Sequence, residues 1–173
     1  FAQSGQDELV LSLHKCKTNG FFLDLAANDA TLYSNTRMLE RDYTWDGVCV
    51  EPNPVYWPRL AMRRCRLVGA LVGAQTNATV TATLHRGANS GIVGKGFDNK
   101  HGHAQEPTVR IDDLLKHVHA PEILDYFSFD VEGAEAFIAS AFPFQTYRVS
   151  VMTVERPKRA AIDLFKQNGL EYL

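Results

Sequence analysis

The chain lacks the features that mark several large classes of protein. No apolar run approaches the roughly 18 residues of a membrane-spanning helix, so we expect no membrane span in this part of the chain. Lysine and arginine number 18 against 20 acidic residues, and the absence of a basic excess argues against a nucleic-acid partner. The sequence has no P-loop and no G-x-G-x-x-G pattern, which counts against a nucleotide- or NAD-binding domain.

Cysteine is scarce, and Cys16, Cys49 and Cys65 form no C-x-x-C pair. This spacing predicts neither a structural zinc site nor a redox motif, and we expect no bound metal. Three thiols cannot all pair with one another. Cys49 lies within the apolar run 48–50 and is predicted to be a buried core thiol.

The sequence assigns no compartment, although we expect a soluble domain. Asn77-Ala78-Thr79 matches the N-glycosylation triplet, which also occurs frequently by chance. No signal peptide is visible. The chain begins at Phe1 rather than at methionine, so we leave open a targeting segment outside this sequence.

What the chain does contain is typical of an α/β protein. Its 173 residues are 45% apolar, enough to bury a core, and we expect a single domain over residues 1–173. Helical spacing over 7–16 predicts a helix in the N-terminal region 1–19. Short apolar runs then alternate with helical segments. This order predicts a mainly parallel, doubly wound sheet in a three-layer α-β-α arrangement.

The apolar runs and turn signals place the individual elements. Asp112 is expected to cap a short helix, and the arginines at 59, 63, 64 and 66 are expected to form a solvated helix end. The polar, glycine-rich stretch 86–107 is predicted to be a long loop. The predicted strands are 21–25, 47–51, 67–72, 78–84, 125–131 and 148–155, and the predicted helices are 34–42, 56–64, 113–117, a segment from 134, and 160–168. Residues 170–173 are predicted to begin one more strand, of a C-terminal hairpin that is truncated here.

The run from Phe21 to Thr36 carries the clearest functional signal. An apolar strand ends in an acid, small residues follow, and a helix begins near Ser34. Such a loop brings backbone N–H groups close to an adenosine-containing cofactor at the carboxyl end of a strand. An ordinary strand–loop–helix connection with a helix cap has the same spacing. The candidate cofactor-binding residues of this run are Asp24, Ala26, Asn28, Asp29 and Asn35.

Glu51 ends the second predicted strand, directly before the turn at Pro52–Pro54. A partly buried carboxylate at this place can accept hydrogen bonds from both hydroxyls of a ribose. The alternative is a surface glutamate before a turn.

A third group of polar residues follows the strand predicted at 125–131. Asp130 and Glu132 are the candidate catalytic residues, because acids at a strand end can orient or deprotonate a hydroxyl nucleophile. Carboxylates in this position can also hold a metal ion. His101 and His103, in the predicted long loop, can act as a base, a substrate clamp or a metal pair, or simply belong to a solvated loop.

The segments DLAANDATLYSNTRMLE, WDGVCVEPNP, NSGIVG, FSFDVEGAE and VMTVE occur in this order, and together they resemble the FkbM-type methyltransferases over roughly residues 6–173. The resemblance implies a Rossmann-like, class I methyltransferase fold. It also implies S-adenosylmethionine as cofactor and a hydroxyl of a small molecule or sugar as acceptor. By this resemblance the cofactor site is lined by Asp24, Ala26, Asn28, Glu51 and Asn53, a small-residue site at Ser90 and Gly91 closes on it, and Asp130 and Glu132 face the methyl group and the acceptor.

Two positions depart from the family's usual first loop, because Ala26 and Ala30 stand where the resemblance implies glycine. An added methyl group at a cofactor contact can weaken binding. Two hypotheses therefore remain open: an O-methyltransferase, and a catalytically inactive methyltransferase-like domain that serves as a structural or interaction subunit with protein partners.

Overall fold

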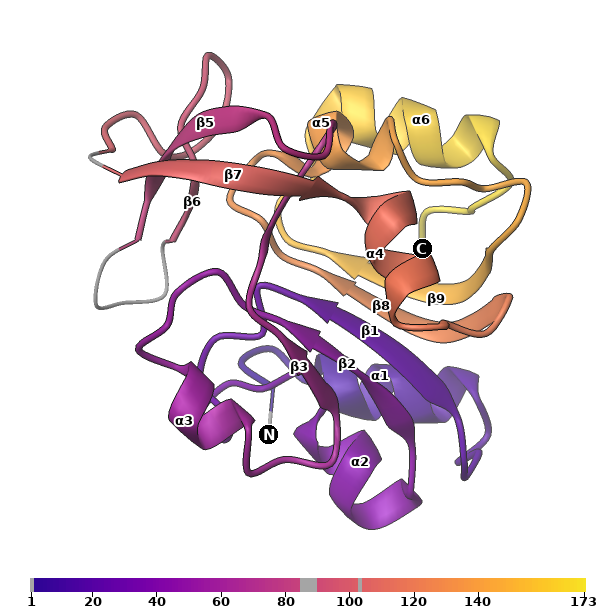
Figure 1. Cartoon of the computed structure of the whole chain (residues 1–173). Coiled ribbons are helices and arrows are strands. Elements are labelled where there is room, and N and C mark those ends of the chain that lie inside the picture. Colours follow the sequence, from indigo (N-terminus) through magenta and orange to yellow (C-terminus); the bar gives the residue numbers. More distant parts are fainter. Residues whose placement is uncertain (1, 85–89, 103) are drawn as a thin grey trace. The chain divides into compact units, whose positions relative to one another are not determined.

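The computed structural model describes residues 2–84, 90–102 and 104–173, in which strands and helices alternate (Figure 1). These residues form two compact units. Unit 1 comprises Phe1–Gly69, Pro121–Phe129 and Tyr147–Thr153, and unit 2 comprises Ala70–Ala120, Asp130–Thr146 and Val154–Leu173. The expected single domain over residues 1–173 stays a prediction.

Unit 1 is built on a parallel sheet, which has five strands in the described part of the chain, in the order β3-β2-β1-β8-β9. The strands are β1 (Phe21–Leu25), β2 (Asp46–Val50), β3 (Arg66–Val68), β8 (Ile123–Phe129) and β9 (Arg148–Val154). The parallel register aligns Asp24 of β1 with Cys49 of β2 and with Ser128 of β8. The mixed α/β class with a parallel sheet is thereby confirmed, and the three-layer, doubly wound arrangement stays a prediction.

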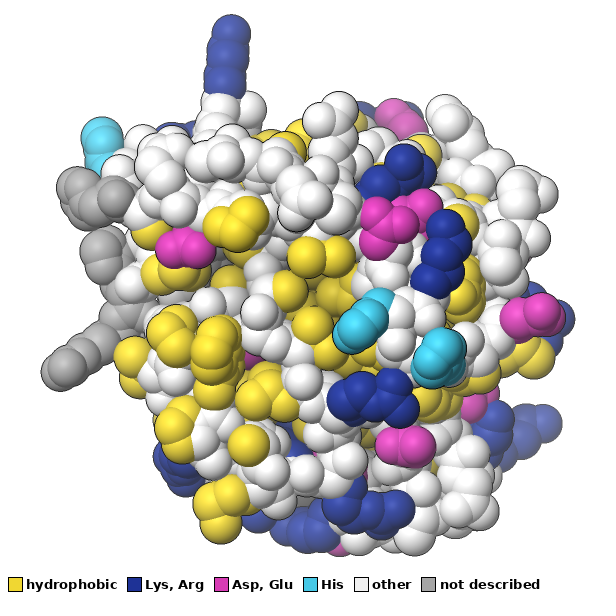
Figure 2. Space-filling view, viewed as in Figure 1, with side chains coloured by type: hydrophobic (Ala, Val, Ile, Leu, Met, Phe, Trp, Pro, Cys, Tyr) yellow, Lys and Arg dark blue, Asp and Glu magenta, His cyan; other side chains and the backbone are white. Residues whose placement is uncertain are grey.

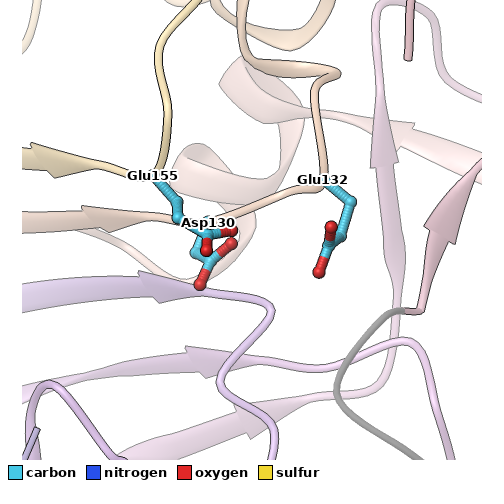
Figure 3. A group of neighbouring side chains, drawn as sticks. All are labelled: Asp130, Glu132 and Glu155. Atoms are coloured by element: carbon cyan, nitrogen blue, oxygen red, sulfur yellow. The ribbon is translucent and has the colours of Figure 1, made fainter. Parts of the chain in front are cut away.

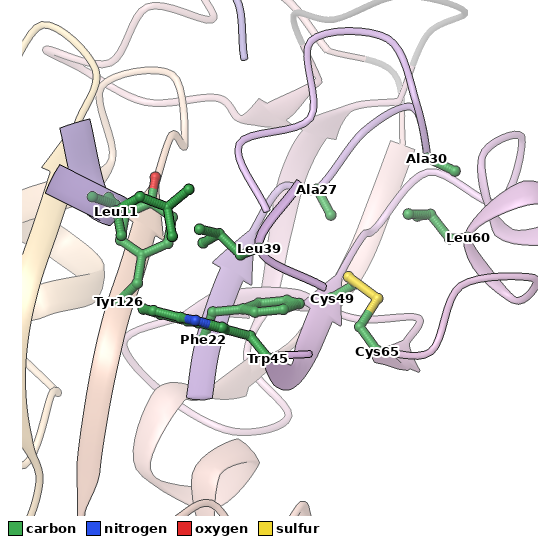
Figure 4. Packing of buried hydrophobic residues seen from close by; sticks show 11 residues of the cluster. Leu11, Phe22, Ala27, Ala30, Leu39, Trp45, Cys49, Leu60, Cys65 and Tyr126 are labelled. Carbon is green, nitrogen blue, oxygen red and sulfur yellow. A yellow bond between two sulfur atoms is a disulfide. The ribbon is translucent and has the colours of Figure 1, made fainter. Parts of the chain in front are cut away.

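The core of unit 1 joins this sheet to two helices. Leu11 of α1 (Gln6–Leu13) and Leu39 of α2 (Arg37–Tyr43) cluster with Phe22 of β1 and Tyr126 of β8 (Figure 4). All four side chains are at most 5% exposed. Full burial of an apolar side chain of this size contributes about 1.5–3 kcal/mol, so this cluster holds α1 and α2 against the strands. A third helix, α3 (Trp57–Leu60), lies between β2 and β3 in the chain.

Cys49 and Cys65 form a disulfide in the same core (Figure 4). The prediction of a core thiol was right about the burial of Cys49 and wrong about its chemical state. Pairing of β2 with β3 brings the two Cα atoms to 5.9 Å, a separation that a disulfide can span. Because that proximity depends on strand pairing, spacing along the chain could not reveal it. Cys16 is free and exposed.

Unit 2 contains a second sheet, in which the described strands have the order β4-β7-β5-β6. The strands are β4 (Leu71–Gly73), β5 (Thr79–Thr83), β6 (Gly91–Ile92) and β7 (Ala104–Arg110). β4 pairs in parallel with β7, whereas β5 is antiparallel to both β6 and β7. The helices of this unit are α4 (Ile111–His117), α5 (Glu135–Ala139) and α6 (Arg159–Gln167), and α5 packs against α6.

Several predicted boundaries in unit 2 were wrong. Residues 67–72 are not one strand, because β3 pairs with β2 and β4 pairs with β7 in a different sheet. The segment 86–107 is not a continuous loop, since it includes β6 and the start of β7. Both corrections follow from strand pairing, which the local sequence pattern does not reveal. Residues 170–173 are described by the structure and form no strand.

Asp112 does not cap its helix. It lies inside the first turn of α4, and Arg110 occupies the N-cap position. The carboxylate of Asp112 instead pairs with Arg110 at 2.9 Å and with Lys116 at 3.6 Å. The acid therefore stabilises the start of α4 by charge rather than by a capping hydrogen bond.

None of the described helices has the length and apolar character needed to cross a bilayer. On the face that Figure 2 presents, basic and acidic side chains are interspersed with apolar ones.

Candidate cofactor and catalytic sites

Asp24 lies near the end of β1 and is 3% exposed. Its carboxylate accepts a hydrogen bond of 2.6 Å from the Thr36 hydroxyl. Burial raises the pKa of Asp24, and the hydroxyl of Thr36, the charge of Arg63 and the hydroxyl of Ser128 act against that rise. The candidate cofactor-binding residue Asp24 is therefore also an internal anchor for the start of α2.

The loop after β1 contains residues in left-handed backbone geometry. Ala26 has φ +59° and Asn28 has φ +54°. Asparagine tolerates this region, whereas alanine adopts it at a cost because its Cβ approaches the following carbonyl. The left-handed backbone at Ala26 therefore explains why the resemblance implies glycine at this position. Ala30 has no positive φ and is buried, so its substitution for glycine has a packing role instead.

Glu51 directly follows β2, and its carboxylate ties two loops together. One oxygen accepts the backbone N–H of Asn28 at 2.8 Å, and the other accepts the backbone N–H of Asn53 at 2.7 Å. The residue is 2% exposed. Burial raises the pKa of Glu51, the two N–H donors oppose that rise, and the nearby charge of Asp24 adds to it. The alternative of a surface glutamate is wrong.

The remaining predicted cofactor residues of unit 1 lie around these two acids. The side-chain amide of Asn35 donates to the Ser128 hydroxyl at 3.0 Å, and Asn53 is 2% exposed. Asp29 accepts from the backbone N–H groups of Thr31 and Leu32 and pairs with Arg59 at 2.9 Å. Burial alone would raise the pKa of Asp29, but these donors outweigh it and lower the pKa.

Sequence reasoning missed a buried ion pair beneath this loop. Arg63 was expected at a solvated helix end, but its side chain is only 5% exposed and lies 2.9 Å from Glu40. Its guanidinium also donates to the hydroxyls of Ser34 and Thr36, each at 3.0 Å, and lies over the ring of Phe22. Arg63 thus reaches Asp24 through the Thr36 hydroxyl. The sequence feature that could have indicated this ion pair is Glu40, an acid next to the core residue Leu39.

The disulfide closes the segment between β2 and β3. Cys49 lies in β2, two residues before Glu51, and the backbone N–H of Glu51 donates to the carbonyl of Val68 in β3. Glu51 and Asn53 therefore lie in a segment whose two ends are joined covalently. This arrangement limits how far the predicted ribose ligand can move in the folded chain.

In unit 2, Asp130 and Glu132 lie in the loop after β8, and Glu155 lies just after β9. One carboxylate oxygen from each residue falls within 4.8 Å of the others. Figure 3 shows Asp130 and Glu155 meeting at the ends of two strands, with Glu132 reaching the group from the loop. Glu132 has φ +56°, a strained value for this residue type. Strain of this kind often occurs at functional sites.

The surroundings of Asp130 favour its protonated form. Burial, a hydrogen bond with Glu155 and repulsion from the surrounding acids raise the pKa of Asp130 to about 8. The pKa of Glu155 is lowered, because hydrogen bonds from Asp130 and Arg156 outweigh its burial. Burial and the charge of Glu155 raise the pKa of Glu132. At neutral pH the protonated Asp130 therefore donates to an ionised Glu155, and its proton can be lost near physiological pH.

Arg156 compensates the charge of this acidic group. Its guanidinium lies 2.9 Å from Glu155 and 3.4 Å from Glu132. Three carboxylates at these distances could hold a divalent cation such as Mg²⁺. Arg156 lies against two of them and offsets part of their charge. Sequence reasoning missed Arg156, although it directly follows a predicted strand end.

The loop after β8 is also held by residues 96–98. The backbone N–H of Asp98 donates to the carbonyl of Glu132, and Lys158 pairs with Asp98 at 2.7 Å. Ser90 is 8% exposed and precedes Gly91, where a side chain would meet Asn99 and Glu132. The predicted small-residue site therefore lies beside the predicted catalytic loop, within unit 2.

Of the two histidine candidates, the structure describes His101. His101 is exposed, and its backbone carbonyl accepts a hydrogen bond from Thr83. His103 lies outside the described residues.

Comparison with known families gives one match. Residues 24–165 match the model of the methyltransferase FkbM domain, a range that begins at Asp24 and includes Glu51 and Asp130. No curated protein and no solved structure matches the chain. The match covers most of the sequence and confirms the resemblance seen in the motifs. The chain belongs to the methyltransferase FkbM domain family.

Proposed function

We propose that this chain transfers the methyl group of S-adenosylmethionine to a hydroxyl of a small molecule or a sugar. Its membership of a methyltransferase family supports methyl transfer in general. The observation that carries the finer proposal is the pair of buried acids, Asp24 and Glu51, at the carboxyl ends of the adjacent parallel strands β1 and β2. Ligands of open α/β sheets bind at this edge, and we include the three-layer, doubly wound arrangement in the proposal.

The residues after β1 and β2 fit the proposed cofactor. Each carboxylate oxygen of Glu51 accepts one backbone N–H and keeps lone-pair capacity for a ribose hydroxyl. Asp24 would accept from the cofactor's ammonium group while it anchors Thr36. Ala26 and Asn28 are both partly exposed, so the loop backbone is accessible to a ligand.

When bound, S-adenosylmethionine supplies an electrophilic methyl group. Asp130 in its ionised form receives the proton of the acceptor hydroxyl, and its pKa of about 8 makes that form a stronger base than an ordinary carboxylate. Glu155 holds the Asp130 carboxyl in place by a hydrogen bond, and Arg156 keeps Glu132 and Glu155 paired. Glu132 orients the acceptor hydroxyl from its strained position in the loop.

Calorimetric titration of the folded chain with S-adenosylmethionine and S-adenosylhomocysteine tests the proposal. We expect saturable heat and a rise in melting temperature with either ligand. Glu51→Gln, which removes one acceptor from the predicted ribose ligand, should weaken binding by about tenfold or more. Glu171→Gln, at an exposed position, is the matched control and should bind as the parent does.

A folded chain that gives neither heat nor a thermal shift would overturn the proposal. That result would favour the alternative, an inactive methyltransferase-like subunit of a larger assembly.

A further inference from the structure

The turn between β4 and β5 presents the side chain of Asn77 to solvent. Asn77 is exposed and has φ +60°, a left-handed geometry that asparagine tolerates. Its backbone N–H donates to the carbonyl of Thr108 at 2.8 Å, and the N–H of Thr108 donates to Ala78 at 2.9 Å. Strand β7 therefore fixes the backbone of this turn, while the Asn77 side chain has no hydrogen bond among the described residues.

Thr79 completes the triplet that an oligosaccharyl transferase recognises. It begins β5 and is exposed, and within the described part of the chain its hydroxyl has no hydrogen bond. The central residue is Ala78 rather than proline, as the triplet requires. Asn77-Ala78-Thr79 is the only such triplet in the sequence.

The disulfide is a second, independent observation that bears on the same compartment. Cys49 is 0% exposed and Cys65 is 5% exposed, so the bond lies in the core of unit 1 rather than at a reactive surface. Structural disulfides form and persist in oxidising compartments and are rare where glutathione keeps thiols reduced. Two cysteine thiols give up two protons and two electrons to a disulfide-carrying oxidant when this bond forms.

We propose that Asn77 carries an N-linked glycan, which the chain acquires in the oxidising secretory compartment where Cys49 and Cys65 pair. The side-chain nitrogen of Asn77 forms a bond to the anomeric carbon of a lipid-linked oligosaccharide. The lipid pyrophosphate leaves, and the amide loses one proton. This inference is independent of the proposed methyl transfer, since neither observation involves Asp24, Glu51 or Asp130.

Mass spectrometry of the intact protein from its own cells tests the proposal. Digestion with an amide-cleaving glycosidase in heavy-oxygen water should convert Asn77 to a labelled aspartate. Alkylation before reduction should label Cys16 and leave Cys49 and Cys65 unlabelled. An unmodified Asn77, or alkylated Cys49 and Cys65, would overturn it.

Two matched variants separate recognition of the triplet from folding. Thr79→Ala removes the hydroxyl that the transferase recognises and should abolish the glycosidase-sensitive shift in gel mobility. Thr79→Ser removes only a methyl group at the same exposed position and should keep the shift. Equal mobility shifts for the two variants would contradict glycosylation at this triplet.

Discussion

Two regions carry acids at the ends of buried strands and stabilise them differently. The first is the carboxyl ends of β1 and β2, and the second is the loop after β8. Around Asp24 and Glu51, backbone N–H groups, a hydroxyl and the buried Arg63 surround the carboxylates. Around Asp130 the neighbours are other acids, and the compensating Arg156 is 66% exposed. The first arrangement suits the fixed binding of a polar ligand, and the second suits a group that gains and loses a proton.

The largest expected effect contrasts the two arginines. Arg63→Met should lower the free energy of unfolding by about 3–5 kcal/mol, because it leaves Glu40 buried without its counter-charge. Arg156→Met should change it far less, since that side chain is exposed to water. Urea denaturation of both variants measures the difference. Similar losses of unfolding free energy in the two variants would show that both regions are stabilised in the same way.

The disulfide gives the next largest effect and concerns only the first region. Cys49→Ala combined with Cys65→Ala should lower the free energy of unfolding by about 3 kcal/mol, the value expected for a closed loop of this length. Because Glu51 and Asn53 lie inside that loop, binding of S-adenosylmethionine should weaken as well. Cys16→Ser is the control, and it should leave both quantities unchanged because Cys16 is free and exposed.

The second region should show a pH dependence that can be assigned to Asp130. The pKa of Asp130 is raised from 3.8 to about 8, so folding favours its protonated form. The resulting stabilisation is complete below about pH 4 and is lost as the pH rises through about 8. Asp130→Asn resembles the protonated acid and should be more stable than the parent above that pH, by roughly 1–2 kcal/mol.

Denaturation on both sides of about pH 8 measures this difference. Asp163→Asn, in an exposed ion pair of α6, is the control and should show no such dependence. A constant difference in stability between Asp130→Asn and the parent across this range would contradict a raised pKa at Asp130.

The smallest effect concerns the two alanines of the first loop. Ala26→Gly should raise the free energy of unfolding by about 0.5–1 kcal/mol, because glycine adopts a positive φ without a Cβ clash. Ala30→Gly should lower it by about 1 kcal/mol, since it removes a buried methyl group and adds backbone freedom. Thermal unfolding of the pair gives the comparison, and equal signs for the two variants would contradict the roles assigned to these alanines.

The sequence by itself determined the alternation of strands and helices and the acids at the strand ends. Asp24, Glu51 and Asp130 could be predicted because an apolar run, a turn signal and a polar residue are local features. The same local pattern identified the FkbM family before any geometry was known. These features depend on residues close together in the chain, so they can be recognised without knowing which strands are neighbours.

Only the tertiary structure decided how those residues are paired. The disulfide, the Arg63–Glu40 pair and the contact between Asp130 and Glu155 each join residues that are distant in the sequence. The division of residues 67–72 between two sheets has the same origin, since it follows from the pairing of β3 with β2 and of β4 with β7. Register and burial set these contacts, and burial then sets the pKa of Asp130. Neither the register nor the burial can be inferred from spacing along the chain.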